Sequence, residues 1–151
     1  MSFKLPEAMA IAIAEAEAAA KRGEVPVGAS IVSPSGEILA RAGNRTLELK
    51  DPTAHAEMLV LRQAATRLGS ERLTDCDLYV TLEPCAMCAG AISHARIRRV
   101  YFGADDPKMG AIEHGPRFFT QATCHHAPEV YGGIGGQRAE TLLRDFFKNR
   151  R

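Results

Sequence analysis

Four residues in two short stretches have the types and spacing of a metal-dependent active site: His55, Glu57, Cys85 and Cys88. An imidazole and two thiolates are ligands that zinc prefers. Cys85 and Cys88 lie three residues apart at an expected helix start, so their sulfurs share one face, where the helix dipole favours thiolates. Three protein ligands leave a fourth zinc position for water, whose pKa zinc lowers to roughly 7. Glu57, two residues after His55, is then placed near the metal to move protons.

Each of these signals, taken alone, has an ordinary explanation. A Cys-x-x-Cys pair at a helix start also occurs as a thioredoxin-like redox pair, as half of a structural zinc site or as two small buried residues. An acid such as Glu57 is favoured in a first helical turn for electrostatic reasons alone. The histidine, the acid and both cysteines occur together in matching strand–helix contexts, and this combination favours a catalytic zinc site.

The first part of the chain predicts one helix and a β-hairpin. Ala-rich residues 7–22 have apolar side chains at helical spacing, and Gly23 follows them as a helix stop. Residues 25–32 and 37–42 are apolar and partly β-branched. They are joined by the turn sequence Ser-Pro-Ser-Gly at 33–36, so we expect them to pair as neighbouring strands.

The rest of the chain alternates strands with helices. Thr53 is expected to cap a helix that carries His55 and ends near Leu68. Further elements are expected at residues 77–82 (strand), 85–94 (helix), 97–103 (strand) and 137–151 (helix). Residues 104–136 are rich in Gly, Pro and His and give no clear pattern, and His125-His126 within them is expected to be solvated. The alternation predicts an α/β domain with helices on both faces of one sheet and parallel later strands.

Length and composition set limits on the class of protein. The chain has 151 residues, 46% hydrophobic and 25% charged, which is typical of one globular domain, so we expect a single domain over 1–151. A formal net charge of +1 gives no overall attraction to nucleic acid or to an anionic membrane. Four cysteines are too few for a disulfide scaffold, and we see no secretory signal or membrane span. These features predict a cytoplasmic protein that does not associate with membranes.

The His-x-Glu and Pro-Cys-x-x-Cys stretches resemble the zinc-dependent cytidine/deoxycytidylate deaminase superfamily. Within it, the sequence is most similar to the branch of bacterial tRNA-specific adenosine deaminases. The resemblance covers nearly the whole chain and is carried by residues 24–29, 43–45, 51–57, 79–91, 103–111 and 145–151. It implies a three-layer α-β-α sandwich with a mixed five-stranded sheet, as in cytidine deaminases. It also implies a homodimer with one Zn²⁺ per subunit.

The resemblance also implies a role for individual residues. The zinc ligands would be His55, Cys85 and Cys88, and the proton-shuttling residue would be Glu57. Asn44 would hydrogen-bond the flipped adenine. The remaining substrate contacts would come from side chains around the base, beside the ribose and phosphate, and in the C-terminal helix, namely Val27, Ala56, Leu82, Asp106, Lys108, Phe146, Phe147, Arg150 and Arg151.

The implied reaction is hydrolytic deamination of the wobble adenosine to inosine in the anticodon loop of an arginine tRNA. Zinc-bound hydroxide attacks C6 while Glu57 shuttles protons, and the target base must be splayed out of the loop to reach a recessed pocket. The same residues would serve a deaminase of a free nucleobase or nucleoside, such as guanine or cytosine. Two different classes also fit the motif: a non-enzymatic zinc- or RNA-binding module, and a thiol redox protein. The redox protein would form a reversible Cys85–Cys88 disulfide.

Overall fold

A five-stranded mixed sheet forms the centre of the structure, a computed structural model that describes residues 4–150. The strands lie in the order β2-β1-β3-β4-β5. Their bounds are β1 (Gly28–Val32), β2 (Ile38–Gly43), β3 (Asp77–Leu82), β4 (Arg99–Ala104) and β5 (Glu129–Tyr131). β1 pairs antiparallel with both β2 and β3, so β2 and β3 run in the same direction. β3, β4 and β5 are parallel neighbours, and a helix connects β3 to β4 as the crossover that a parallel pair requires.

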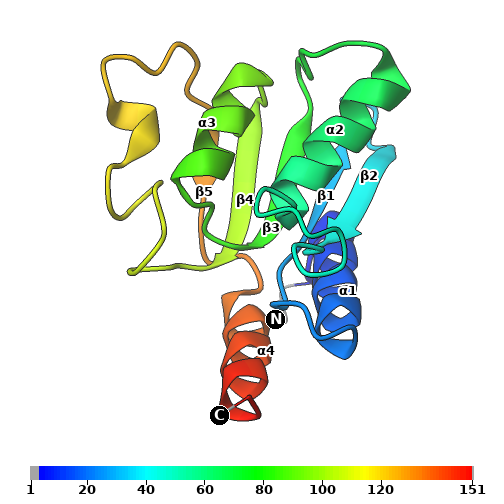
Figure 1. Ribbon diagram of the computed structural model, residues 1–151. Coiled ribbons are helices and arrows are strands. Elements are labelled where there is room, and N and C mark those ends of the chain that lie inside the picture. Colours follow the sequence, from blue (N-terminus) through cyan, green and yellow to red (C-terminus); the bar gives the residue numbers. More distant parts are fainter. Residues whose placement is uncertain (1–3, 151) are drawn as a thin grey trace.

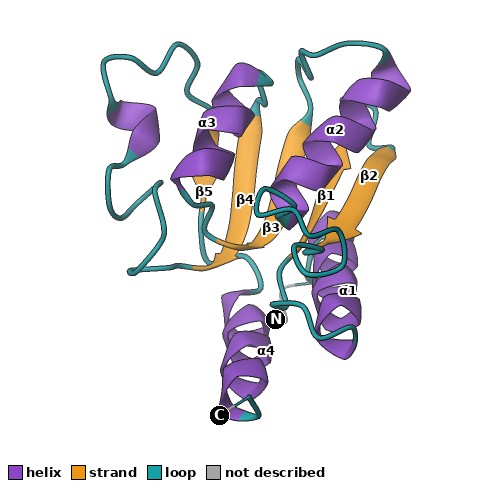
Figure 2. Cartoon of the chain, viewed as in Figure 1, coloured by secondary structure: helices purple, strands orange, loops and turns teal. Residues whose placement is uncertain are grey.

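Within the described residues, four α-helices cover the two faces of this sheet, as Figures 1 and 2 show for the arrangement of the layers. Helices α2 (Ala56–Leu68) and α3 (Ala86–His94) lie side by side on one face. Helices α1 (Glu7–Lys21) and α4 (Gly136–Lys148) are on the other side, where α1 contacts β1, β2 and β3 while α4 contacts β4. A short 3₁₀-helix, η1 (Phe118–Thr120), packs beside α3. The expected three-layer α-β-α sandwich is confirmed.

The core lies between the sheet and its helices. Ile31, Leu78, Val80, Val100 and Phe102 come from three neighbouring strands and are at most 1% exposed. These five side chains share the face of the sheet that packs against α2 and α3. On the opposite face Tyr79 and Tyr101 are half-buried and pack against α1.

Two glycines let α1 approach the hairpin closely. A Cβ at Gly28 would overlap the backbone of Ala12, and a Cβ at Gly43 would overlap the carbonyl of Glu15.

Several element boundaries differ from those that the sequence predicts. Thr53 does not cap α2, because its hydroxyl donates to Asp51 Oδ1 (2.7 Å) and the helix begins after His55. β1 begins at Gly28, because the chain turns tightly at Pro26, where the Val27 N–H donates to the Val25 carbonyl (2.8 Å). The segment without a clear pattern contains η1 and the short edge strand β5. Within residues 4–150, no helix is long and apolar enough to cross a membrane.

Candidate metal centre and active site

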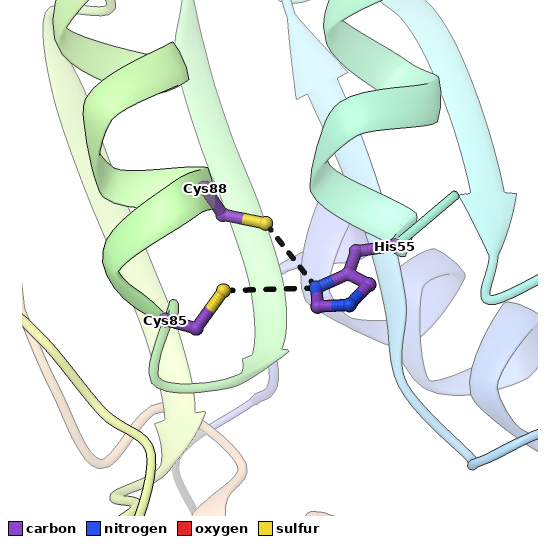
Figure 3. A group of neighbouring side chains, drawn as sticks. All are labelled: His55, Cys85 and Cys88. Atoms are coloured by element: carbon purple, nitrogen blue, oxygen red, sulfur yellow. Dashed lines mark hydrogen bonds between the residues drawn. The ribbon is translucent and has the colours of Figure 1, made fainter. Parts of the chain in front are cut away.

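The fold brings two helix starts together at one edge of the sheet. β2 and β3 run in the same direction, so the segments that follow them emerge at the same edge, separated by β1. His55 occupies the N-cap position of α2 and Cys85 that of α3, with Cys88 in the first turn of α3. Figure 3 shows the imidazole and the two thiols pointing toward one another across the gap between these helices.

The distances between these three side chains fit a zinc ion. His55 Nδ1 lies 3.7 Å from Cys85 Sγ and 3.5 Å from Cys88 Sγ. All three ligand atoms lie within 4.8 Å of one another. Tetrahedral zinc with ordinary Zn–N and Zn–S bond lengths places a nitrogen and a sulfur ligand roughly 3.6 Å apart. The donor set and its spacing therefore suit zinc with three protein ligands.

The electrostatics of the two thiols favour a metal ligand pair. The hydrogen bond from Cys88, together with His55, lowers the pKa of Cys85 to about 4. The contact with Cys85 and burial raise the pKa of Cys88. The hydrogen bond with Cys85 raises the pKa of His55. A bound cation would favour the thiolate form of both cysteines, because a thiol that coordinates a metal is deprotonated.

Glu57 lies in the first turn of α2, beside this group, and is 4% exposed. Burial raises the pKa of its carboxyl to about 7. A carboxyl with this pKa gains and loses a proton easily near neutral pH, which suits a general acid/base. We call His55, Glu57, Cys85 and Cys88 the catalytic floor.

A cavity of about 260 Å³ opens over the catalytic floor. It is lined by residues from five separate segments: Val25, Val27, Asn44, Thr46, His55, Glu57, Leu82, Glu83, Cys85, Asp106 and Met109. The expected substrate residues Val27, Asn44, Leu82 and Asp106 are therefore at the cavity. Ala56 is fully buried and Lys108 is exposed, and neither lines this cavity.

Ala56 instead fixes the orientation of Asn44. The Ala56 N–H donates to Asn44 Oδ1 (2.8 Å). A backbone N–H can only donate, so the amide oxygen of Asn44 is committed and its Nδ2 is left to donate to a ligand.

Asp106 shapes the loop that carries Lys108. Asp106 Oδ1 accepts from the backbone N–H groups of Lys108 and Met109, both at 3.1 Å.

The expected residues of the C-terminal helix lie apart from the catalytic floor. α4 projects beyond the edge of the sheet at which β3 ends and α3 begins (Figure 1). The guanidinium of Arg150 lies 4.3 Å from the centre of the Phe146 ring, and Phe147 is exposed. Arg150 and Phe146 line a separate cavity of about 330 Å³. Arg151 lies outside the described residues.

The reasoning from sequence missed four residues that line the cavity over the floor: Val25, Thr46, Glu83 and Met109. Glu83 lies directly before the Pro-Cys-x-x-Cys stretch, and this position is a signal in the sequence that could have found it.

Two histidines of the segment without a clear pattern have defined contacts. His114 Nδ1 donates to Glu83 Oε1 (2.8 Å). His126 Nε2 donates to the Ile97 carbonyl (2.6 Å), so it is not at the catalytic floor.

Comparison with known proteins agrees with this site. The sequence profile of the cytidine and deoxycytidylate deaminase zinc-binding region matches residues 4–104, which include the whole catalytic floor. The chain therefore belongs to this zinc-binding deaminase family.

Among individual proteins, the chain is 58% identical to the tRNA-specific adenosine deaminase of Agrobacterium fabrum over 143 residues, 95% of this chain and 93% of that protein. It also superposes with a TM-score of 0.88 on a structure from studies of A-to-I editing by tRNA:A34 deaminases at the wobble position of transfer RNA. That match has 58% identity and covers 90% of this chain and 98% of the other. Guanine deaminase from Bacillus subtilis matches with a TM-score of 0.63 and 40% identity, covering 65% of this chain and 62% of the other.

Proposed function

We propose that this protein is a zinc-dependent hydrolase that converts the wobble adenosine of a tRNA anticodon loop to inosine. The observation that carries this function is the catalytic floor: three converging metal ligands beside a buried glutamate whose pKa is about 7. The tRNA substrate is supported by the 58% identity, across almost the whole chain, to a tRNA-specific adenosine deaminase.

The reaction needs a nucleophilic water, a proton for the ring and a departing amine. His55, Cys85 and Cys88 would hold zinc, which when bound supplies a Lewis acid that makes water nucleophilic near neutral pH. Glu57 would take one proton from the attacking water and deliver it to ring atom N1. The second proton of that water would pass to the amino group on C6, which leaves as ammonia while the C6 carbonyl forms. Asn44 Nδ2 would donate to the base, because Ala56 already occupies Asn44 Oδ1.

The cavity suits a base that has left its stack. Side chains of Val27 and Leu82 line its apolar part, and Asn44 supplies the directional hydrogen bond. A nucleotide in an anticodon loop can be splayed out at a lower cost than one in a duplex.

α4 offers a second contact with the RNA. The exposed end of this helix carries Phe147, Lys148 and Arg150, which combine an aromatic face with positive charge. This combination binds single-stranded RNA by stacking and by phosphate contacts. Arg150 also reaches toward Gly23, in the loop that leads to Val25 of the cavity, so α4 and the cavity can meet one RNA loop.

Deamination of a free base is the weaker candidate. The guanine deaminase of Bacillus subtilis shares the fold but covers only 65% of this chain, with lower identity than the tRNA deaminase structure. A free base would also make no use of the exposed aromatic and basic end of α4.

The remaining parts of the proposal concern assembly and location. We propose a single catalytic domain over residues 1–151 that works as a homodimer with one zinc ion per subunit. The similarity to the bacterial tRNA-deaminase branch supports this assembly. A tRNA substrate supports a site of action in the cytoplasm, where tRNA is used.

The direct test is inosine formation in an arginine-tRNA anticodon stem-loop with a wobble adenosine. Zinc-loaded wild-type protein is compared with the Glu57→Ala variant, and guanine, cytosine and adenosine serve as parallel substrates. We expect inosine in the stem-loop from the wild type only, and no ammonia from guanine, cytosine or free adenosine. Ammonia from a free base, with the stem-loop unchanged, would reject the tRNA substrate and retain the zinc chemistry.

A further inference from the structure

A second buried glutamate, Glu83, organises a long loop beside the catalytic floor. Glu83 lies between the end of β3 and Cys85, and its side chain is fully inaccessible to solvent. Its Oε1 accepts from the Asp106 N–H (3.0 Å) and from His114 Nδ1 (2.8 Å). Its Oε2 accepts from three successive N–H groups, those of Ile112 (3.1 Å), Glu113 (3.0 Å) and His114 (3.2 Å). One carboxylate thus receives five hydrogen bonds, all from residues 106–114.

We call residues 105–114 the wall segment, which leaves the sheet at the end of β4 (Figure 1). It contains no helix or strand of its own, so most of its N–H groups have no regular partners. Hydrogen bonds to an ionised carboxylate are stronger than those between neutral groups. The Glu83 carboxylate therefore replaces the secondary structure that the wall segment lacks.

The backbone next to Glu83 joins the wall segment to a metal ligand. The Ala111 N–H donates to the Pro84 carbonyl (2.9 Å), and Cys85 forms an antiparallel bridge with Gly110. A Cβ at position 110 would overlap the Glu83 carboxylate and the Asp106 carbonyl. The wall segment is therefore held directly against Cys85, at a distance that only glycine permits.

The wall segment carries two side chains of the cavity, Asp106 and Met109. Met109 is 69% exposed, so it lies at the rim, where nucleotides next to the target base would pass. Asp106 Oδ1 fixes the turn before it by accepting from the Met109 N–H. Any displacement of the wall segment therefore moves the rim relative to the metal ligands.

The opposite side of the cavity is held in the same way. Glu24 is 2% exposed, and its carboxylate accepts from the N–H groups of Leu47 (3.1 Å) and Glu48 (2.9 Å). The loop that it holds carries Asn44 and Thr46 of the cavity. Two buried carboxylates thus hold two of the loops that line the cavity.

We propose that Glu83 is a positioning residue for the reaction: its carboxylate folds the wall segment and fixes it against Cys85, and so determines how the RNA fits over the catalytic floor. This inference rests on the proposed function for its kinetic consequence. Its structural consequence can be tested without any substrate.

The Glu83→Gln variant tests both consequences, because every acceptor position of the carboxylate faces a donor. The amide nitrogen that this variant introduces will occupy the position of Oε1, where the ring of His114 can accept from it through the other tautomer. The Asp106 N–H then faces a donor and loses its acceptor. We expect full zinc content and a cooperative unfolding transition. Amide hydrogen exchange should become faster within residues 105–114, and KM for the stem-loop should rise about tenfold with kcat changed much less.

A second variant and a control complete the experiment. Gly110→Ala leaves the carboxylate intact but displaces the wall segment, so it should reproduce the rise in KM. Asp77→Asn at the other end of β3 removes the Arg98 ion pair, and it should leave exchange in the wall segment and KM unchanged.

Three outcomes would overturn the proposal. The first is amide hydrogen exchange within residues 105–114 of Glu83→Gln that is the same as in the wild type. The second is a KM of Glu83→Gln for the stem-loop within twofold of the wild-type KM. The third is a rise in KM in Asp77→Asn as large as the rise in Glu83→Gln. If Glu83→Gln does not fold, amide hydrogen exchange and KM of the Gly110→Ala variant test the proposal in its place. A wild-type protein that leaves the stem-loop unchanged would reject the proposed function, while the exchange data would still decide whether Glu83 holds the wall segment.

Discussion

The catalytic floor and the wall segment each depend on one buried glutamate, but the surroundings of the two carboxylates differ. Glu57 is 4% exposed, and burial raises its pKa to about 7. Glu83 is 2% exposed, and burial again acts to raise its pKa. Hydrogen bonds from the Asp106 N–H, the His114 ring and neighbouring N–H groups outweigh burial, and the pKa of Glu83 is lowered. The number of donors that face a buried carboxyl, more than burial itself, decides its charge.

This difference matches the two roles that we propose, one for a group that moves protons and one for a group that holds structure. A carboxyl with a pKa near neutral changes its protonation state at little cost, as a general acid/base must. A carboxylate with five donors remains charged and keeps its position. The contrast leads to predictions for both regions.

Removing a metal ligand should have the largest effect. The Cys88→Ala variant should lose its zinc and all measurable inosine formation, because two protein ligands hold the ion much less tightly than three. Zinc content is measured by atomic absorption, with Cys124→Ser, which alters a cysteine outside the metal centre, as the control. Chelation of wild-type zinc should also lower the melting temperature, and added zinc should restore it. Full activity in Cys88→Ala would show that the floor is not a metal centre.

Replacing Glu57 should abolish turnover while the metal remains. We expect Glu57→Gln to bind zinc and the stem-loop as wild type does and to lose about 10²–10⁴-fold in kcat, the usual contribution of a general acid/base. Glu113→Gln, an exposed glutamate of the wall segment, is the matched control. If Glu57→Gln loses zinc together with activity, then Glu57 is a ligand or a structural residue, and the contrast with Glu83 fails.

Changes in α4 should weaken RNA binding without affecting chemistry. Arg150→Ala removes a positive charge and the contact with the Phe146 ring. KM for the stem-loop should rise several-fold, and the slope of log affinity against log salt should decrease by about 1. Arg67→Ala is the control, because it removes one positive charge in the last turn of α2, away from the catalytic floor. It should change neither KM nor the salt dependence. Loss of kcat in Arg150→Ala, with KM unchanged, would place α4 in the catalytic step.

Replacing Asp51, a half-buried carboxylate with few hydrogen-bond donors, should have the smallest effect, and this effect is on stability. Hydrogen bonds from the Thr53 hydroxyl and N–H lower the pKa of Asp51 below its ordinary value of 3.8, and the charge of Arg62 acts in the same direction. A lowered pKa in the folded state adds stability above the ordinary value, and that stability is lost as the pH falls through the lowered value. Urea unfolding should therefore show a small deficit for Asp51→Asn at pH 7 that disappears in strong acid. If the loss of unfolding free energy in Asp51→Asn became larger as the pH falls, the prediction would be wrong.

The local motifs allowed much of the floor to be predicted from sequence. His55, Glu57, Cys85 and Cys88 lie within two short stretches, each at the start of a periodic apolar helix, so their types and spacing were sufficient. The strands β1 to β4 were predicted because their buried positions are apolar, whereas β5 lies in the segment without a clear pattern and was not predicted. The cap of α2 was predicted wrongly, because the hydroxyl of Thr53 has a competing partner in Asp51.

The sequence alone determined the zinc-ligand set and the acid beside it. These residues lie at fixed spacing at the start of two helices, and such spacing is a local property of the chain. Only the tertiary structure decided the cavity. Glu83 finds its five donors 23 to 31 residues further along the chain, in a segment without periodicity. Val25, Thr46 and Met109 reach the cavity from separate loops, and two of these loops donate hydrogen bonds to a buried carboxylate. Contacts between irregular segments leave no repeating pattern in a sequence, because they are fixed by hydrogen bonds that exist only after the sheet has formed.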